Sequence, residues 1–472
     1  MMQIGGILLT AFNWLVLVYF FLINLIYLTT NLFAFKSLKT YVRRLKALDI
    51  EDLIISAGAP PVTIIAPAYN EEKDCVAATR ALLTMKYPEY EVIVVNDGST
   101  DNTLQVLKEA FDLAPVARYP TAELATAEIR EVYWSRRYAH LLVVDKENGG
   151  KSDAINAAMN YCRTPLVCQI DADTLLESDA LIRIVRPFLE DEKVIAAGGI
   201  IRIVNGCVVE GGTVKEVHLP RNLLAQFQVM EYLRAFLSGR MGWEAMDSLL
   251  IISGAFGIFR RSFVVKVGGY ATDTVGEDME LVVRLHRHCR ENNIPYRITF
   301  ISDPVGWTEC PETLKSLGRQ RDRWQRGMYE VLSRNMNMFL NPRYGRIGLL
   351  AFPYFLLFEL GGPLLEVPGY LAVALAIGMD MASPAYIGAF FSLAIVFGVA
   401  LSVAAVGLEE LTLRRYPRLR DLLKMFLLAF VENFGYRQLT VFWRLRGLVS
   451  GIRHVQGWGK MERKGFNSEP PG

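Results

Sequence analysis

Residues 62–101 read VTIIAPAYNEEKDCVAATRALLTMKYPEYEVIVVNDGSTD. Two apolar runs, one beginning at Val62 and one at Val92, stand on either side of a helical stretch over Glu71–Met85. Uninterrupted apolar runs of this length are typical of strands that are buried on both faces. The order strand, helix, strand therefore predicts two parallel strands of an α/β sheet.

Further apolar runs follow the same pattern: HLLVVD at 140–145, PLVCQID at 165–171 and KVIAAGGIIRI at 193–203. Helical stretches over Lys151–Tyr161 and Asp179–Leu189 lie between them. We predict a mostly parallel sheet between about Pro61 and Tyr344, with helices on both faces. The stretch from Ala114 to Ala139 shows no clear element, and we interpret it as an insertion.

The triplet Asp171-Ala172-Asp173 stands where one of these strands ends. Ligands of such sheets bind at the carboxyl ends of the strands. In an extended chain, residues two apart point to the same side, so both carboxylates can face one ion. Hard cations such as Mg²⁺ or Mn²⁺ bind through one or two carboxylates and substrate phosphates. A polar turn after a buried strand is the alternative explanation.

Other polar residues stand at neighbouring strand ends. Asp97 either terminates its strand or accepts hydrogen bonds from a nucleobase or ribose. Tyr69 and Glu71 suit base stacking and ribose binding. Lys151 opens a helix after a glycine-rich turn, which is a position suited to a phosphate.

Two acidic residues, Glu277 and Asp278, begin an amphipathic helix. Acidic residues in a first helical turn usually complement the helix dipole, and we interpret Glu277 in this way. Asp278 is a candidate general base for an acceptor hydroxyl.

Gln320, Arg323 and Trp324 fall at helical positions i, i+3 and i+4, on one shared face. Arginine binds a diphosphate through two parallel hydrogen bonds, and an indole face suits a sugar ring. A basic helix that binds anionic lipid is the alternative, and both can hold.

The composition limits the class of protein. Of the 472 residues, 52% are hydrophobic and 21% are charged, which predicts a soluble domain flanked by membrane spans. The net charge of +2 argues against nucleic acid as a partner. Six cysteines lack a metal or disulfide spacing, which favours reduced thiols. His286, His288 and Cys289 are predicted to lie on a solvated helix face and not to bind zinc.

The first charged residue is Lys36, and the apolar run before it is long enough to cross a bilayer. Lysines and arginines follow at once, which places the chain after this span in the cytoplasm. Two further spans are predicted over Ile347–Met379 and Ala385–Leu408, followed by arginines at 414–420. The stretch Leu422–Ile452 either spans or lies in the membrane interface.

The set Asp97, Asp171-x-Asp173, Asp278 and Gln320-x-x-Arg323-Trp324 resembles the D, DxD, (E)D, QxxRW pattern of processive family 2 glycosyltransferases. These include the membrane synthases of cellulose, chitin, hyaluronan and poly-β-1,6-N-acetylglucosamine. SGAFGIFRRS, GEDMEL and PETLKSLGRQRDRW are most similar to the last of these. The resemblance implies a GT-A domain inserted between transmembrane helices and an inverting transfer from a UDP-sugar, UDP-N-acetylglucosamine before UDP-glucose, to a growing β-linked polysaccharide.

The resemblance also implies residue roles. Asp97 would contact uridine, Asp171 and Asp173 the metal and diphosphate, and Asp278 would be the base. Gln320, Arg323 and Trp324 would line the acceptor and leaving-group site. One N-terminal span instead of two, and a short C-terminal membrane region, leave room for an accessory export partner.

Two alternatives stay open, a transferase that adds one sugar to a lipid carrier and an inactive membrane scaffold or transporter. The expected layout is a span at 1–35, a basic cytoplasmic linker at 36–60, a catalytic domain at 61–345, and at 346–472 a membrane region with a basic tail. We expect a multi-pass protein of a bacterial inner membrane with its catalytic domain in the cytoplasm.

Overall fold

The computed structural model describes residues 2–47, 58–121, 123–413, 415–416 and 418–454. The chain divides into two compact units. Among the described residues, the sheet unit comprises 40–47, 58–221 and 249–310, and the helical unit comprises 2–39, 222–248 and 311–454. Most of the expected linker and the whole basic tail, including Lys460, lie outside the described residues.

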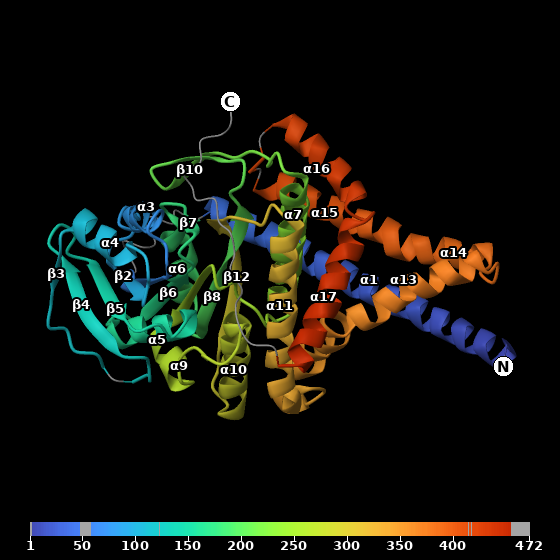
Figure 1. The fold of residues 1–472 in the computed structure, drawn as a ribbon, viewed down its shortest axis with the longest axis horizontal. Helices are drawn as coiled ribbons and strands as arrows, with labels where there is room; N and C mark the ends of the chain where they lie inside the picture. The colour runs from blue at the N-terminus through green and yellow to red at the C-terminus, as the bar shows by residue number, and fades with distance from the viewer. Residues whose placement is uncertain (1, 48–57, 122, 414, 417, 455–472) are drawn as a thin grey trace. The chain divides into compact units, whose positions relative to one another are not determined.

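The sheet unit is built on one ten-stranded sheet, whose strands follow one another in the order β3-β4-β5-β2-β1-β6-β11-β8-β12-β7 (Figure 1). In this order the strands are Leu113–Pro115, Ile129–Ser135, Leu141–Lys146, Tyr90–Asp97, Val62–Ala68, Leu166–Ile170, Phe256–Arg260, Val194–Ile203, Arg297–Thr308 and Thr174–Leu176. A separate hairpin pairs β9 (Val208–Glu210) with β10 (Thr213–Glu216).

The sheet is mixed and not mostly parallel. Strands β5, β2, β1 and β6 are parallel neighbours, as are β8 and β12. In contrast, β11 pairs antiparallel with both β6 and β8, β7 pairs antiparallel with β12, and β3 and β4 add an antiparallel edge. The α/β class is confirmed, and the five strands expected from apolar runs are all present.

The interpretation of Ala114–Ala139 as an insertion without elements is wrong. This stretch contributes β4 and most of β3 to the edge of the sheet. Exposed polar residues interrupt the buried ones along β4, whose sequence is IREVYWS. This strand, second from the edge of the sheet, has no continuous apolar run, which is the pattern that the sequence criterion requires.

In the described part of this unit, six helices accompany the sheet: α3 (Cys75–Leu82), α4 (Thr103–Phe111), α5 (Lys151–Tyr161), α6 (Ala180–Glu190), α9 (Arg261–Lys266) and α10 (Glu277–Glu291). Helix α5 packs against β1, β2 and β5 and is buried from Ser152 to Tyr161. Its alanines let it approach the sheet closely, and this fixes the position of Lys151 at its first turn.

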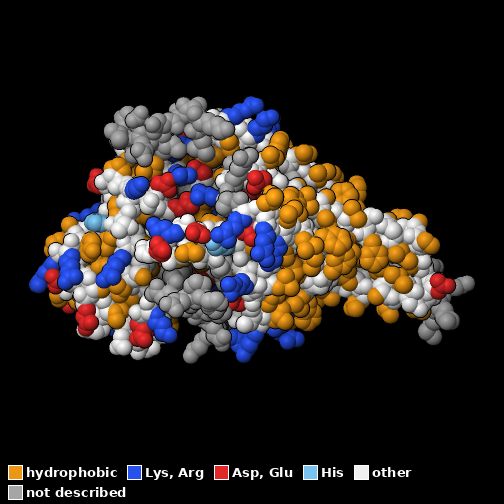
Figure 2. All heavy atoms as spheres, turned by 90° about the horizontal axis from the view of Figure 1, so that it is seen from above, with side chains coloured by type: hydrophobic (Ala, Val, Ile, Leu, Met, Phe, Trp, Pro, Cys, Tyr) orange, Lys and Arg blue, Asp and Glu red, His pale blue; other side chains and the backbone are white. Residues whose placement is uncertain are grey.

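Among the residues that the structure describes, three helical stretches are long and apolar enough to cross a membrane: Leu9–Arg43, Ile347–Gly378 and Pro384–Leu411. They match the three spans expected from the sequence. Large apolar side chains on them are exposed, and Figure 2 shows hydrophobic side chains gathered over a broad area of the helical unit. Helix α1 (Met2–Ala47) continues past the expected end of its span at residue 35.

The helices of the helical unit after α1 are α7 (Leu223–Tyr232), α8 (Met241–Ala245), α11 (Leu314–Arg334), α12 (Phe352–Tyr354), α13 (Gly362–Gly378), α14 (Pro384–Phe391), α15 (Phe397–Thr412), α16 (Leu419–Val431) and α17 (Tyr436–Ile452). Short π- or 3₁₀-helical segments connect several of them: Leu233–Arg240, Met336–Met338, Pro342–Tyr344, Ile347–Ala351, Phe355–Leu360 and Ser392–Val396. The stretch Leu422–Ile452 is thus two helices, α16 and α17, with a break between them.

Candidate active site

The carboxyl ends of four parallel strands carry most of the sequence-predicted site residues. The register pairs Ala68 of β1 with Asn96 of β2, and Asp97 of β2 with Lys146 of β5. Strand β6 pairs with β1 on its other side and leads directly into Asp171. These strand ends therefore meet at one edge of the sheet, as expected for a parallel α/β core.

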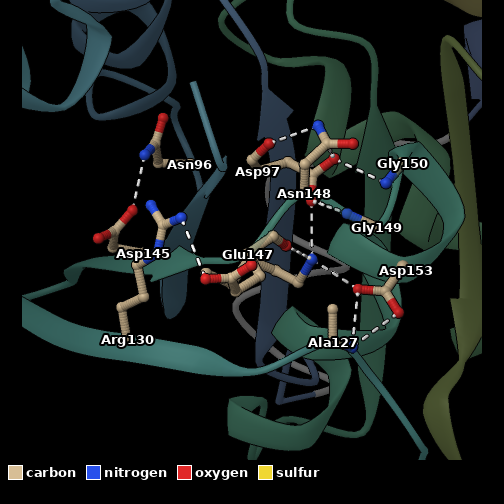
Figure 3. A network of polar contacts seen from close by, with 11 residues as sticks. Asn96, Asp97, Ala127, Arg130, Asp145, Glu147, Asn148, Gly149, Gly150 and Asp153 are labelled. Atoms are coloured by element: carbon tan, nitrogen blue, oxygen red, sulfur yellow. Dashed lines mark hydrogen bonds and ion pairs between the residues drawn. The ribbon is translucent and has the colours of Figure 1, made fainter. Parts of the chain in front are cut away.

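Asp97 lies at the centre of a buried polar network (Figure 3). Its Oδ1 lies 2.7 Å from the Lys146 ammonium and accepts a hydrogen bond from the Gly149 N–H, 3.0 Å away. Its Oδ2 accepts from the Gly150 N–H at 2.8 Å and from the Asn148 amide at 3.2 Å. Asp97 is only 3% exposed. Its carboxylate therefore holds the glycine-rich turn before α5, a task that the sequence did not indicate.

Lys146 was missed by the sequence interpretation, because its strand reads as a plain apolar run. Its side chain is completely buried and its ammonium also lies 2.6 Å from Asp153 in α5. Asp153 in turn accepts hydrogen bonds from the Ala127 N–H. This chain of contacts connects β2, β5, α5 and the loop before β4.

Hydrogen bonds connect the segment after β1 with the segment after β2 at the same edge of the sheet. Asn70, in the left-handed conformation at φ 56°, accepts a hydrogen bond from the Thr100 N–H at 2.8 Å. The Glu71 N–H donates to Thr103 Oγ1 at 2.8 Å. Tyr69 is 49% exposed. The structure thus leaves the Tyr69 ring accessible at the strand ends, where a base could stack on it.

The Asp171-Ala172-Asp173 triplet is a turn and not an extended segment. The Thr174 N–H donates to the Asp171 carbonyl at 3.0 Å, which closes the turn before β7. The expectation that an extended backbone aligns the two carboxylates was therefore wrong in its geometry. The short strand β7 begins immediately at Thr174, so the chain must reverse within the triplet.

Lys151 joins the triplet to α10. Its ammonium lies 2.6 Å from Asp171 Oδ1 and 2.9 Å from Glu277 Oε1. Burial alone would lower the pKa of Lys151, but the two carboxylates outweigh it and raise the pKa well above that of a free lysine. Burial raises the pKa of Glu277, and Lys151 opposes that rise. Glu277 is therefore an ion-pair partner, and its interpretation as a dipole partner alone was incomplete.

Asp278 lies beside this pair. Its Oδ2 accepts a hydrogen bond from the Gly254 N–H at 3.2 Å, and its Oδ1 accepts from the Met279 N–H at 2.8 Å. Gly254 is held by Gln169 of β6, whose amide donates to the Gly254 carbonyl at 3.0 Å. A Cβ at Gly254 would lie 3.0 Å from the Lys151 ammonium. Asp278 and Lys151 thus both lie next to Gly254 of the SGAF segment, where a side chain would contact each of them.

The helical unit carries the remaining predicted residues on α11. Gln320 is 7% exposed and accepts from Arg321, whereas Trp324 is 43% exposed. The Arg321 guanidinium stacks 4.2 Å from the Trp324 ring centroid and pairs with Glu231 of α7 at 2.7 Å. The helix predicted for this motif is confirmed. The pairing of Arg321 with Glu231 and its contact with the indole were not predicted from the sequence.

Two aspartates would hold a divalent cation whose other ligands come from water or from phosphates. Within the described part of the chain, no group of three or more His, Cys, Asp or Glu could hold a metal. Asp171 and Asp173 offer two carboxylates, which suits a cation that takes its other ligands from phosphates and water. The Asp171 side chain is 31% exposed and can be reached from solvent.

His286 and Cys289 do not lie on a solvated face, contrary to expectation. Both are buried in α10, at 3% and 0% exposure. The His286 Nε2–H donates to the Leu249 carbonyl at 2.8 Å, and Nδ1 accepts from the Tyr296 hydroxyl at 2.8 Å. Burial lowers the pKa of His286 to about 4, so the ring is neutral at physiological pH.

The family model described as "Glycosyltransferase like family 2" matches residues 60–327. The chain is a family 2 glycosyltransferase. The matched residues run from just before β1 into α11 and include every site residue described above. The enzyme class and the GT-A fold expected from the motifs are thereby confirmed.

Relatives of this glycosyltransferase include the poly-β-1,6-N-acetyl-D-glucosamine synthase of Staphylococcus aureus, which is 28% identical over 292 residues. The match covers 62% of this chain and 60% of that synthase. A probable glycosyltransferase of Bacillus subtilis, YdaM, is 26% identical over 408 residues, 84% of each chain. The fold is similar to that of a mannosyltransferase of Pyrobaculum calidifontis in complex with GDP-mannose and Mn²⁺. The TM-score is 0.53 at 17% identity, over 92% of this chain and 99% of that one.

Proposed function

We propose that this glycosyltransferase moves a sugar from a nucleoside-diphosphate sugar to a growing β-linked polysaccharide with inversion at the anomeric carbon. UDP-N-acetylglucosamine is the favoured donor, because the Staphylococcus aureus relative is a poly-N-acetylglucosamine synthase. UDP-glucose is the next candidate. The GDP-mannose held by the Pyrobaculum calidifontis protein makes GDP-mannose the donor to compare with both.

One observation carries this proposal. Lys151 on α5 and Asp278 on α10 both lie next to Gly254, and Asp171, in the loop after β6, pairs with Lys151. The Lys151 ammonium and the carboxylates of Asp171 and Asp278 are thus brought together at the carboxyl edge of the sheet. A diphosphate leaving group needs positive charge, and an attacking hydroxyl needs a base.

In the proposed reaction Asp278 removes the proton of the acceptor hydroxyl as its oxygen attacks the anomeric carbon in line with the leaving diphosphate. The Gly254 N–H and the helix start orient this carboxylate. No second carboxylate is needed as a nucleophile, since a single displacement inverts the configuration. An α-linked donor therefore yields a β-linked product.

The proposed contacts with the nucleotide-sugar donor come from residues at the carboxyl ends of the strands. Asp171 and Asp173 would hold Mg²⁺ or Mn²⁺, which when bound would neutralise charge on the diphosphate. Lys151 would meet the same diphosphate. Tyr69 would stack on the base and Glu71 would bind the ribose. Asp97 would act through the 148–150 turn that it holds, because protein donors already occupy both of its oxygens.

On α11, Gln320, Arg323 and Trp324 would bind the acceptor and the leaving group, which is a proposal from their family motif. The stacking of Arg321 on Trp324 supports it, because it fixes the indole plane without burying the ring. Aromatic faces of this kind bind sugars through apolar contact.

Membrane attachment is proposed through the three candidate spans, with basic residues such as Lys36 and Lys39 on the cytoplasmic side. The sheet unit would then draw its donor from the cytoplasm, and an accessory partner would assist export. Lipid contacts would cover the exposed apolar side chains of the spans.

The test is a donor panel with purified protein in detergent. UDP-N-acetylglucosamine, UDP-glucose and GDP-mannose are each supplied with Mg²⁺ or Mn²⁺, and the product is analysed by mass spectrometry. A β-linked polymer from one donor supports the proposal. A lipid bearing one sugar would refute polymer synthesis and keep the transferase chemistry, and no turnover with any donor would favour the scaffold alternative.

A further inference from the structure

The Lys151 ammonium is shared between two carboxylates of unequal depth. Asp171 Oδ1 lies 2.6 Å away and Glu277 Oε1 lies 2.9 Å away. The Asp171 side chain is 31% exposed, that of Lys151 19% and that of Glu277 only 6%. The lysine therefore bridges an inner carboxylate, on α10, and an outer carboxylate at the strand end.

The inner carboxylate is not free to leave the lysine. Glu277 is the first residue of α10, and the next residue, Asp278, is fixed by the Gly254 N–H. Gly254 also closes one side of the ammonium, because a side chain there would lie 3.0 Å from the Lys151 nitrogen. The outer carboxylate lies in a turn open to solvent, so the contact with Asp171 is the one that can be exchanged.

We infer that Glu277 is a positioning residue that controls, through Lys151, how strongly the Asp171–Asp173 pair binds a divalent cation. This inference rests on the proposed use of such a cation and of a donor diphosphate at this site. Lys151 occupies an oxygen of Asp171 that the cation needs, so the ammonium and the cation compete. Glu277 keeps hold of the ammonium when Asp171 releases it, and so keeps it within reach of the diphosphate.

Substitutions that remove the charge of Lys151 or of Glu277 should then change the affinity for the cation in opposite directions. Removing the lysine charge leaves Asp171 without its competitor, so the cation should bind more tightly. Neutralising Glu277 leaves Asp171 as the main anionic partner of Lys151, so the cation should bind more weakly. A purely structural ion pair would instead weaken cation binding whichever partner is lost.

A simple through-space field would also give opposite signs, and a double-mutant cycle separates the two explanations. If Glu277 acts through Lys151, the effect of Glu277→Gln must disappear once the lysine is gone. If Glu277 acts directly through space, its effect must be the same in both backgrounds.

The experiment measures the binding of Mn²⁺ alone to the purified full chain in detergent, by the electron paramagnetic resonance signal of free Mn²⁺. The proteins are wild type, Lys151→Met, Glu277→Gln and the double variant. Lys193→Met, at an exposed lysine, and Glu280→Gln, which pairs with Arg284 on the same helix, are charge-matched controls. Circular dichroism and thermal unfolding establish that each variant is folded.

We expect Lys151→Met to tighten Mn²⁺ binding and Glu277→Gln to weaken it, each by on the order of tenfold. In the Lys151→Met background, Glu277→Gln should change the affinity by less than about twofold. The two controls should stay close to wild type. If Glu277→Gln folds poorly, Glu277→Asp replaces it, because the shorter side chain keeps the charge but withdraws it from the ammonium. Its effect on Mn²⁺ affinity must vanish in the Lys151→Met background.

An equal effect of Glu277→Gln in both backgrounds would overturn the inference, as would weaker binding in both single variants. A wild-type chain that binds no Mn²⁺ would overturn it as well. None of these outcomes depends on sugar transfer, which the donor panel measures separately. A chain with the expected cycle but no turnover would keep the inference and refute the proposed function.

Discussion

The Lys146 ammonium lies 2.7 Å from the Asp97 carboxylate, and both side chains are almost completely buried, at 0% and 4% exposure. The pair connects the ends of β5 and β2, and the same carboxylate holds the turn that starts α5. The position of Lys151 therefore depends on the Lys146–Asp97 ion pair, which forms within the protein and does not require a ligand.

Lys146→Met should destabilise the sheet unit strongly. It leaves the Asp97 and Asp153 carboxylates buried without their cation, and breaking a buried pair in this way costs about 3–5 kcal/mol. The measurement is the midpoint of thermal unfolding in detergent. Arg130→Met is the matched control, because the Arg130–Glu147 pair is about half exposed and should contribute little. Equal midpoints for the two variants would show that the buried pair is energetically unimportant.

Gly98 shows why this network escaped prediction from the sequence. Its φ is +64°, and a Cβ there would lie 2.6 Å from the backbone nitrogen of Asn148. Residues 50 positions apart thus pack backbone to backbone, and no periodicity in the sequence reports such a distance. The strand containing Lys146 was correctly predicted, but a pattern of apolar residues cannot reveal that its last residue points inward.

The strand ends were predictable because parallel strands place their carboxyl ends at one edge. Asp97, Asp171 and Asp278 were identified in this way and from motif order. The sequence could not reveal which carboxylates form ion pairs with lysines of the protein. The contacts of Asp97 with Lys146 and of Glu277 with Lys151 arise from packing between distant elements, as do the antiparallel pairings of β11 with β6 and β8.

Asp278→Asn should abolish sugar transfer. An amide cannot accept the proton of the acceptor hydroxyl, and the loss of a general base lowers the rate by on the order of 10²–10⁴-fold. Affinity for UDP should stay within about twofold, since the amide can still accept the Gly254 hydrogen bond. Initial rates and calorimetry measure the two effects. Asp273→Asn, at an exposed residue of the preceding loop, is the control. A variant that keeps half of the activity would place the base elsewhere.

Chelation should remove activity reversibly. Two carboxylates without further protein ligands hold a cation weakly, so EDTA should strip it and added Mg²⁺ or Mn²⁺ should restore turnover. Asp173→Asn should lose activity at ordinary metal concentrations and keep the wild-type unfolding midpoint. Full turnover in excess chelator would refute the metal assignment, whatever the effect of the substitution.

His286 should make the stability of the sheet unit depend on pH. The ring is buried and its pKa is lowered to about 4, against 6.5 for an exposed histidine. The unfolded chain therefore binds a proton below pH 6.5 that the native chain refuses until about pH 4. The contribution of His286 to the free energy of unfolding is complete above pH 6.5, and it falls by roughly 3 kcal/mol as the pH decreases to 4.

The measurement compares unfolding midpoints between pH 7 and pH 4 for wild type, His286→Gln and His288→Gln. Other groups also titrate in this range, so the difference between the curves is the quantity of interest. His286→Gln should flatten the curve, and His288→Gln, two residues along α10, is the matched control. Parallel curves for all three proteins would mean that His286 accepts its proton in the native state.

Trp324→Ala should reduce the length of the product while sparing the binding of UDP. The indole is 43% exposed and is held in orientation by Arg321, which is itself anchored to Glu231. A platform of this kind can hold the terminal sugar of a glycan, so its loss should raise the KM for the acceptor and release short chains. Arg323→Ala should weaken both UDP binding and transfer, because a guanidinium there serves the diphosphate.

Arg321→Lys provides the sharpest comparison for the platform. Lysine keeps the charge next to Glu231 but lacks the planar group that stacks on the indole, so product length should fall between those of wild type and Trp324→Ala. Mass spectrometry of the product and calorimetry with UDP measure the two effects for each variant. Product of normal length from Trp324→Ala would show that α11 is a lipid-facing helix, and the acceptor site would then have to be sought on other residues.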